Sequence, residues 1–510
     1  MDKVKRMLMT ILTSGIATIL SLLISFLLTP YITNRLGVES YGFVTLAKNF
    51  TQYATIITIA LNSYASRYIT VSYHQNDKKL SQKYLSSVYY GDVAISAVIM
   101  MTAIVFILFL EKVFNISSEL VFPVKLLFFF VFSSFVLTTV GTSFSAAAYV
   151  KNRLDIVGVF RSLSYIVEII FYLIVFTCMT PAVWQVGVAI CIAQLVIFIG
   201  NYYIYIKYTP DLRIKRKYVS LQAIKKLVVN GIWNSINSLG NTLNSGLDLV
   251  VTNLWLSDLA MGQIAITKTL SSICMSFNQL LAQPFQPLLL KSYSDGNKKK
   301  LISELKLSMK LTGLFSSIIF AGFFVLGKVF YNLWIPGQDI DLIYNLTVIT
   351  MVASIVEGPV YPLYYIYTLT LKNKIPCIIT VIGGIFNVIG MAVLVKYSSL
   401  GIYSIVLTTT IIMLFINLVT NPLYMTHCLK VKWFTFYPSL IRTIISCVCM
   451  IFVFTMIMNI INPCTWLKFI LTALLCGIVG CIIHLILVFS NKEKSNILLI
   501  LKKKRNSYSN

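Results

Sequence analysis

Long runs of apolar residues follow one another along the whole chain, separated by short polar or basic connections. Each run has about 20 or more residues, the length that a helix needs to cross a hydrocarbon core of about 30 Å. The pattern predicts an all-α polytopic membrane protein with about fourteen transmembrane helices. The predicted spans are 7–31, 41–66, 84–110, 122–147, 157–179, 181–206, 227–251, 260–288, 306–331, 341–370, 375–395, 399–425, 436–461 and 464–489.

The composition supports a transporter and argues against an enzyme. Only 12% of the 510 residues are charged, whereas a soluble domain carries roughly 25%. Fourteen spans leave no room for a soluble catalytic domain. The sequence shows no Ser/His/Asp set, no glycine-rich phosphate loop and no metal-ligand spacing among its ten cysteines. We therefore expect no catalytic residues, no metal and no cofactor.

The formal net charge of +25 is distributed as membrane orientation requires. A nucleic-acid binder gathers Lys and Arg on one solvated face, but here these residues lie in the connections between apolar runs. If the N-terminus is cytoplasmic, cytoplasmic segments and helix ends hold 34 of the 42 Lys and Arg residues, and outer connections hold six. This bias predicts that both termini are cytoplasmic and that nucleic acid is not a partner.

An internal repeat relates the two halves of the chain at an offset of 220 residues. Each half has the pattern Gly-x5-Lys near the start of its second helix, followed by a Ser-Tyr and a Lys-Lys pair. The superposed positions are Gly42 on Gly262, Lys48 on Lys268, Ser72-Tyr73 on Ser292-Tyr293, and Lys78-Lys79 on Lys298-Lys299. We expect parallel repeats with the substrate site between them, as is common in transporters.

The long basic connection after the sixth span is taken as the hinge between two lobes. It contains Pro210 and the run Arg213-Ile-Lys-Arg-Lys217. The predicted domains are an N-lobe (1–206), a cytoplasmic linker (207–226), a C-lobe (227–425), helices 13 and 14 (426–489) and a basic cytoplasmic tail (490–510).

The stretch from Leu28 to Phe43, Leu-Thr-Pro-Tyr-Ile-Thr-Asn-Arg-Leu-Gly-Val-Glu-Ser-Tyr-Gly-Phe, continuing to Arg67, resembles the amino-terminal signature of bacterial Wzx-type oligosaccharide flippases. These belong to a superfamily with the multidrug and toxin extruders and the lipid II flippase. The segments at Leu247-Asp248 and Pro284–Pro287 also resemble the family pattern. Ala60-Leu61-Asn62 departs from it where many relatives carry glycine.

This resemblance implies two six-helix bundles in a V, plus two C-terminal helices, that open alternately to either side of the bacterial plasma membrane. The implied substrate is an undecaprenyl-pyrophosphate-linked oligosaccharide repeat unit, moved from the cytoplasmic to the outer leaflet for surface polysaccharide assembly. Membrane lipids and other polysaccharide-assembly membrane proteins are the implied partners.

Charged residues inside the spans are the candidate functional positions, because an ionised group in hydrocarbon is costly unless it faces a wet cavity or a partner. For substrate binding we single out Lys48 and Lys268, with Arg67 and Arg161 nearer the cytoplasmic ends. Lysine is a point-charge partner for phosphate. The alternative is that each lysine extends along its stem to the membrane surface.

Four carboxyl groups are candidates for binding a coupling H+ or Na+, namely Glu357, Glu168, Asp248 and Asp92. The alternative is a structural partnership with nearby cations, which is favoured for Asp248 near a helix end. The sequence Glu357-Gly-Pro-Val-Tyr-Pro362 predicts a helix break at mid-membrane.

The tyrosines that follow, Tyr361, Tyr364, Tyr365 and Tyr367, either stack on sugars or belong to the interfacial aromatic belt.

Three other functions compete with lipid-linked oligosaccharide transport. A cation-coupled drug extruder would share the fold. A membrane-embedded polysaccharide polymerase or glycosyltransferase usually needs a sizeable outer loop, and the longest outer connection here has only about a dozen residues. A membrane scaffold without transport activity would not need the paired repeats.

Overall fold

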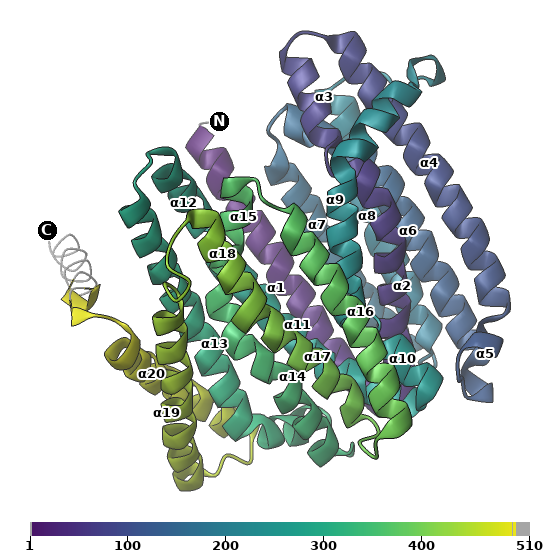
Figure 1. Cartoon of the computed structure of the whole chain (residues 1–510). Coiled ribbons are helices and arrows are strands. Elements are labelled where there is room, and N and C mark those ends of the chain that lie inside the picture. Colours follow the sequence, from purple (N-terminus) through teal and green to yellow (C-terminus); the bar gives the residue numbers. More distant parts are fainter. Residues whose placement is uncertain (1–2, 492, 496–510) are drawn as a thin grey trace, which may run out of the picture. The chain divides into compact units, whose positions relative to one another are not determined.

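The computed structural model describes residues 3–491 and 493–495 (Figure 1). Every regular element in this part of the chain is a helix.

Eleven segments of the described chain are long and apolar enough to cross a membrane, and they coincide with eleven of the predicted spans. The helices that form them are α1 (Lys3–Leu36), α4 (Lys78–Leu108), α6 (Val121–Val150), α7 (Leu154–Cys178), α8 (Val183–Tyr208), α13 (Lys298–Trp334), α14 (Ile340–Val360) with η3 (Tyr361–Tyr364) and α15 (Tyr365–Thr370), α16 (Lys374–Tyr397), α17 (Tyr403–Phe415) with η4 (Ile416–Thr420) and α18 (Asn421–Leu429), α19 (Tyr437–Ile461), and α20 (Trp466–Val488). The prediction of an all-α membrane protein is confirmed.

The other three predicted spans are also helices, but polar residues lower their hydropathy. They are α2 (Val38–Asn62), α9 (Leu221–Ser245) and α11 (Asp258–Ala282), each 25 residues long. At about 1.5 Å per residue, such a helix is long enough to cross the hydrocarbon core. All fourteen predicted spans therefore have a helix of sufficient length.

The structure confirms the internal repeat in the bounds of its helices. The helix α11 begins and ends 220 residues after α2, and α13 begins 220 residues after α4. The helix α3 (Ala65–His74) likewise recurs as α12 (Phe285–Ser294). The capping residue recurs too, since Asp77 accepts a hydrogen bond from the first turn of α4 and Asn297 does so for α13. The sequence repeat therefore corresponds to a repeated helix–helix–helix unit.

Contacts divide the chain into two compact units. Unit 1 contains Met1–Ile266 and Thr380–Val388, and unit 2 contains Thr267–Ile379 and Ile389–Asn510. The lobe boundaries expected from the sequence remain a prediction.

Within unit 1, the predicted linker lies against α3 and α4. Asp211 accepts a hydrogen bond from Tyr73 at 3.1 Å and forms an ion pair with Lys78 at 2.9 Å. Burial of the Asp211 carboxyl opposes its ionisation, but the hydrogen bond from Lys78 and the other donors outweigh burial and hold its pKa below the ordinary value. The first part of the linker is therefore fixed to unit 1.

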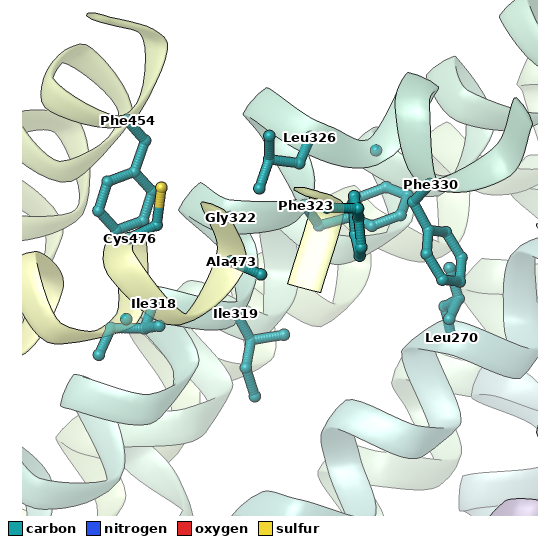
Figure 2. A pocket seen from close by; sticks show the side chains of 13 residues that line it. Leu270, Ile318, Ile319, Gly322, Phe323, Leu326, Phe330, Phe454, Ala473 and Cys476 are labelled. Carbon is teal, nitrogen blue, oxygen red and sulfur yellow. The ribbon is translucent and has the colours of Figure 1, made fainter. Parts of the chain in front are cut away.

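In unit 2, α13 packs against α14, α19 and α20. The helices α13, α19 and α20, together with α11, surround an apolar cavity of about 270 Å³ (Figure 2). Its lining consists of Leu270, Ile318, Ile319, Gly322, Phe323, Leu326, Gly327, Phe330, Phe454, Phe469, Ala473, Cys476 and Gly477. The final helix pair therefore contributes to an apolar pocket within unit 2.

Candidate functional site

Uncharged polar residues of α2 and the α9 region line a cavity of about 320 Å³ in unit 1, which we call the α2–α9 cleft. The lining residues are Asn49, Gln52, Thr55, Ser238, Asn241, Thr242, Ser245 and Gly246. Polar side chains on membrane helices avoid lipid and face protein or a water-filled cavity. The cleft is therefore a polar cavity between two long helices of unit 1.

The spacing of polar residues explains why the cleft forms between these two helices. On α9, Asn230, Asn234, Ser238, Asn241 and Ser245 recur every three or four residues, so they share one face of the helix. Polar residues recur at similar spacing on α2. Two polar faces that cannot meet lipid are best placed against each other.

Two hydrogen bonds join α2 to α9 and to the residue that follows it, close to the cleft. The Ser235 hydroxyl donates to the carbonyl oxygen of Ile56 at 2.8 Å. Further along, the Tyr53 hydroxyl donates to the carbonyl oxygen of Gly246. These bonds to the main chain set the separation of the two helices.

Lys48 lies one residue before the cleft on α2 and is half-buried. Its charge interacts favourably with that of Glu168 on α7, a residue that is only 6% exposed. The Tyr172 hydroxyl donates to Glu168 Oε1 at 3.0 Å. The structure thus brings together two residues that the sequence suggested for different roles.

Asp92 connects three helices of unit 1. Its side chain is completely buried, and its two carboxylate oxygens accept hydrogen bonds from Asn62 Nδ2 and from the Ser143 hydroxyl, each at 2.8 Å. These donors lie on α2 and α6, while Asp92 lies on α4. The arrangement is that of a structural carboxyl group, and the coupling role of Asp92 remains a prediction.

The remaining candidates in unit 1 lie outside the lining of the cleft. Asp248 is buried at the start of α10 (Asp248–Trp255), where its charge interacts with Tyr53. Arg67 on α3 and Arg161 on α7 are exposed. Their predicted binding and coupling roles remain predictions.

Lys268 lies on α11 in unit 2 and is half-buried. It occupies the position that corresponds to Lys48 in the repeat. The joint action of the two lysines on one substrate remains a prediction.

The α-helix is interrupted within the segment 357–362, as the sequence predicts, but the interruption begins after Glu357 rather than at it. The helix α14 continues through Gly358 and Pro359, and the interruption is the following 3-10 turn, η3. Gly358 packs closely against α13, because an added Cβ would lie 1.6 Å from the Ser316 hydroxyl oxygen. The absence of a side chain at Gly358 lets α14 lie against α13 at this level.

Two of the tyrosines proposed for sugar stacking are used within unit 2. The Tyr364 hydroxyl donates to Asn417 Oδ1 at 2.7 Å, and the Tyr367 hydroxyl donates to Asn421 Oδ1 at 2.9 Å. These bonds tie the interrupted helix to η4 and α18. These hydrogen bonds account for the hydroxyl groups of both tyrosines without a sugar ligand.

We expect Glu357→Gln to remove the dependence of transport on an imposed ion gradient while leaving the protein level unchanged. The amide keeps the shape of the side chain but can neither bind a proton nor carry a negative charge. Transport by purified protein in vesicles under an imposed H+ or Na+ gradient measures this effect. The exposed Glu119→Gln serves as control. A normal gradient response in Glu357→Gln would remove this residue from coupling.

The polar residues of the cleft were not predicted from the sequence, because they carry no charge and the candidate positions were the charged residues within the spans. The signal was present as the three- and four-residue spacing of Asn and Ser on α9.

Comparison with known proteins agrees with this architecture. Residues 8–291, more than half of the chain, match the family described as polysaccharide biosynthesis protein. The chain is 27% identical over 482 residues to the uncharacterized membrane protein EpsK of Bacillus subtilis (strain 168), covering 94% of this chain and 95% of EpsK.

Two solved structures show the same fold. The lipid II flippase MurJ in an inward closed conformation has a TM-score of 0.71 at 16% identity and covers 94% of this chain and 99% of MurJ. An inward-facing multidrug resistance transporter of the MATE family in the MOP superfamily has a TM-score of 0.65 at 15% identity, covering 82% of this chain and 96% of the transporter. The family match supports the resemblance to Wzx-type flippases, and the two structures show that the chain shares the fold of MurJ and of a MATE transporter.

Proposed function

We propose that this chain, which belongs to the polysaccharide biosynthesis protein family, moves undecaprenyl-pyrophosphate-linked oligosaccharide repeat units from the inner to the outer leaflet of the bacterial cell membrane. The observation that carries the proposal is the α2–α9 cleft beside Lys48, a polar cavity within a membrane-spanning unit. Such a cavity offers an amphiphilic substrate a route for its polar head group through the hydrocarbon. The flipped unit would then pass to other membrane proteins of polysaccharide assembly.

Lys48 and its repeat partner Lys268 are assigned to the pyrophosphate. A lysine ammonium group attracts phosphate oxygens as a point charge, and this attraction is stronger where the surroundings are less polar than bulk water. The Glu168 carboxyl group lies close enough to Lys48 for the two side chains to interact electrostatically. We propose that, when the substrate binds, its pyrophosphate replaces Glu168 as the partner of Lys48 or shares Lys48 with it.

The apolar cavity of unit 2 is suited to the lipid tail. Its lining is apolar, and its residues come from α11, α13, α19 and α20 (Figure 2). The last two helices lie outside the repeated units, so a role specific to a lipid-bearing substrate accounts for their presence.

Two sets of contacts in unit 1 hold neighbouring segments together. They join α2 and the loop before α6 to the end of α10 and the start of α11. Gly42 lies against the backbone of Gly262. The side chains and backbones of Asn115 and Asn253 exchange three hydrogen bonds of 2.6–3.0 Å. With cytoplasmic termini, all four residues lie on the outer side, so release to the outer leaflet requires these contacts to separate. A bound H+ or Na+, with Glu357 and Glu168 as its first candidates, would drive the cycle.

A cation-coupled multidrug extruder is the second candidate, because the fold is shared with a MATE transporter. Hydrophobic cationic drugs are recognised by apolar and aromatic surfaces and by acidic groups. The α2–α9 cleft has amides and hydroxyls instead, which favours a carbohydrate-bearing substrate.

A disulfide between cysteines placed at positions 115 and 253 is expected to stop export of the surface polymer. The bond would hold the outer contacts closed, so the lipid-linked oligosaccharide would accumulate in the inner leaflet. Polymer at the cell surface and lipid-linked intermediate in the membrane are measured before and after reduction. Each single variant, Asn115→Cys and Asn253→Cys, serves as control. Continued export by the fully cross-linked protein would contradict the proposed outer opening.

A further inference from the structure

We infer that the α2–α9 cleft is a binding subsite for uncharged, hydroxyl-rich sugar, adjoining the pyrophosphate contact at Lys48 but chemically separate from it. This inference rests on the proposed function and names the part of the substrate that the cleft holds.

The chemistry of the lining selects a neutral ligand with many hydroxyl groups. Seven of the eight lining residues have an amide or hydroxyl side chain, and none is charged. Each amide and hydroxyl can both donate and accept a hydrogen bond, as each sugar hydroxyl can. An anion bound to this lining alone would lack a cationic partner, and a metal ion would lack a carboxylate. The lining therefore favours a sugar over a phosphate or a cation.

Two amides of the cleft are available to a ligand. The side chains of Gln52 and Asn241 are exposed and point from opposite helices of the cleft. In the part of the chain that the structure describes, neither amide makes a hydrogen bond to another residue. Both groups can therefore bind a sugar hydroxyl without breaking a bond within the protein.

The close packing of α2 and α9 limits the width of the cleft. A Cβ on Gly231 would lie 2.1 Å from the carbonyl oxygen of Ala60, so the helices are nearly in backbone contact at this level. The cavity of about 320 Å³ is at the small end of the roughly 300–1,000 Å³ that ligand pockets occupy. It is suited to one small part of an oligosaccharide, while the rest of the chain extends beyond it.

The order of groups on α2 matches the order of groups in the substrate. Lys48, Gln52 and Thr55 are four and three residues apart, so they lie on one face of the helix. Gln52 is about 6 Å further along the helix axis than Lys48. In the proposed substrate the first sugar is bonded directly to the pyrophosphate. A head group at Lys48 therefore places the sugar nearest to it at the cleft.

Binding of two lipids to the purified full chain tests this subsite. One probe is the undecaprenyl-pyrophosphate-linked repeat unit extracted from the producing strain, and the other is undecaprenyl pyrophosphate without sugar. We expect the wild type to bind the sugar-bearing lipid more tightly. The double variant Gln52→Leu/Asn241→Leu should lose about tenfold or more in affinity for that lipid, as expected for two lost hydrogen bonds, and should keep its affinity for undecaprenyl pyrophosphate.

Two further variants and the wild type distinguish the sugar subsite from the proposed function on which it rests. Thr102→Leu, at an exposed position on α4 whose hydroxyl bonds only to its own helix, should bind both lipids normally. Lys48→Ala should weaken the binding of both. Equal affinity of the wild type for the two lipids, or an equal loss for both in the Gln52→Leu/Asn241→Leu protein, would overturn the sugar subsite. Failure of the wild type to bind either lipid would instead overturn the proposed function.

Discussion

Gly262→Ala is expected to reduce export of the surface polymer by more than tenfold and to lower the melting temperature of the purified protein. An added Cβ would lie 2.2 Å from the carbonyl oxygen of Val38 and 2.6 Å from its carbon. Both atoms belong to the main chain, so no side-chain rotation can relieve the overlap. Overpacking of this kind costs about 1–3 kcal/mol and more where the backbone must move. The helices α2 and α11 would have to separate.

A graded series identifies close packing as the cause. Gly42→Ala should be less severe, because its Cβ would lie 2.9 Å from the nearest atoms of Gly262 and Met261. Gly15→Ala is the matched control on α1, where no atom lies within 4 Å of an added Cβ. Alanine there should be neutral or slightly stabilising. Wild-type export and melting temperature in Gly262→Ala would show that α2 and α11 do not need this contact.

Lys48→Ala and Lys268→Ala are each expected to reduce polymer export, and the double variant should be worse. Loss of one cationic partner should weaken head-group binding by about 1–3 kcal/mol. Lys→Arg at either position should retain part of the activity, because the charge persists in a different shape. Export is measured as polymer at the cell surface in strains with equal protein levels. Wild-type amounts of polymer in both alanine variants would contradict the assignment.

The neighbouring carboxylate allows a sharper test at Lys48. Removing the lysine also leaves Glu168 buried without its attracting charge, so a defect in Lys48→Met alone does not distinguish substrate binding from stability. The double variant Lys48→Met/Glu168→Gln removes both charges and should recover the melting temperature. If Lys48 binds substrate, this stable protein should still fail to export. Recovery of export would make Lys48 a structural partner of Glu168.

Much of the fold could be predicted because segments that cross the membrane are recognised directly from the hydropathy of the sequence. Eleven predicted spans coincide with helices apolar enough to cross a membrane. The 220-residue repeat gave the correspondence of α2 with α11 and of α4 with α13. These features depend on local composition and on pattern, which a single sequence contains.

The candidate site was less predictable because it depends on contacts between distant segments. The attraction between Lys48 and Glu168 joins residues that are far apart in sequence. The close packing of Gly358 of α14 on Ser316 of α13 is invisible without the neighbouring helix. Asn241 and its polar neighbours on α9 carry no charge, so the pattern of charged residues in the sequence does not indicate them.

Movement of the lipid-linked repeat unit between leaflets is the most direct test of the central claim. The purified full chain is placed in vesicles that hold the extracted lipid in one leaflet, and a membrane-impermeant lectin measures the sugar that reaches the other. We expect faster movement than in protein-free vesicles and in vesicles with Gly262→Ala. A rate equal to that of protein-free vesicles, together with gradient-driven uptake of a cationic drug, would contradict it and favour the extruder.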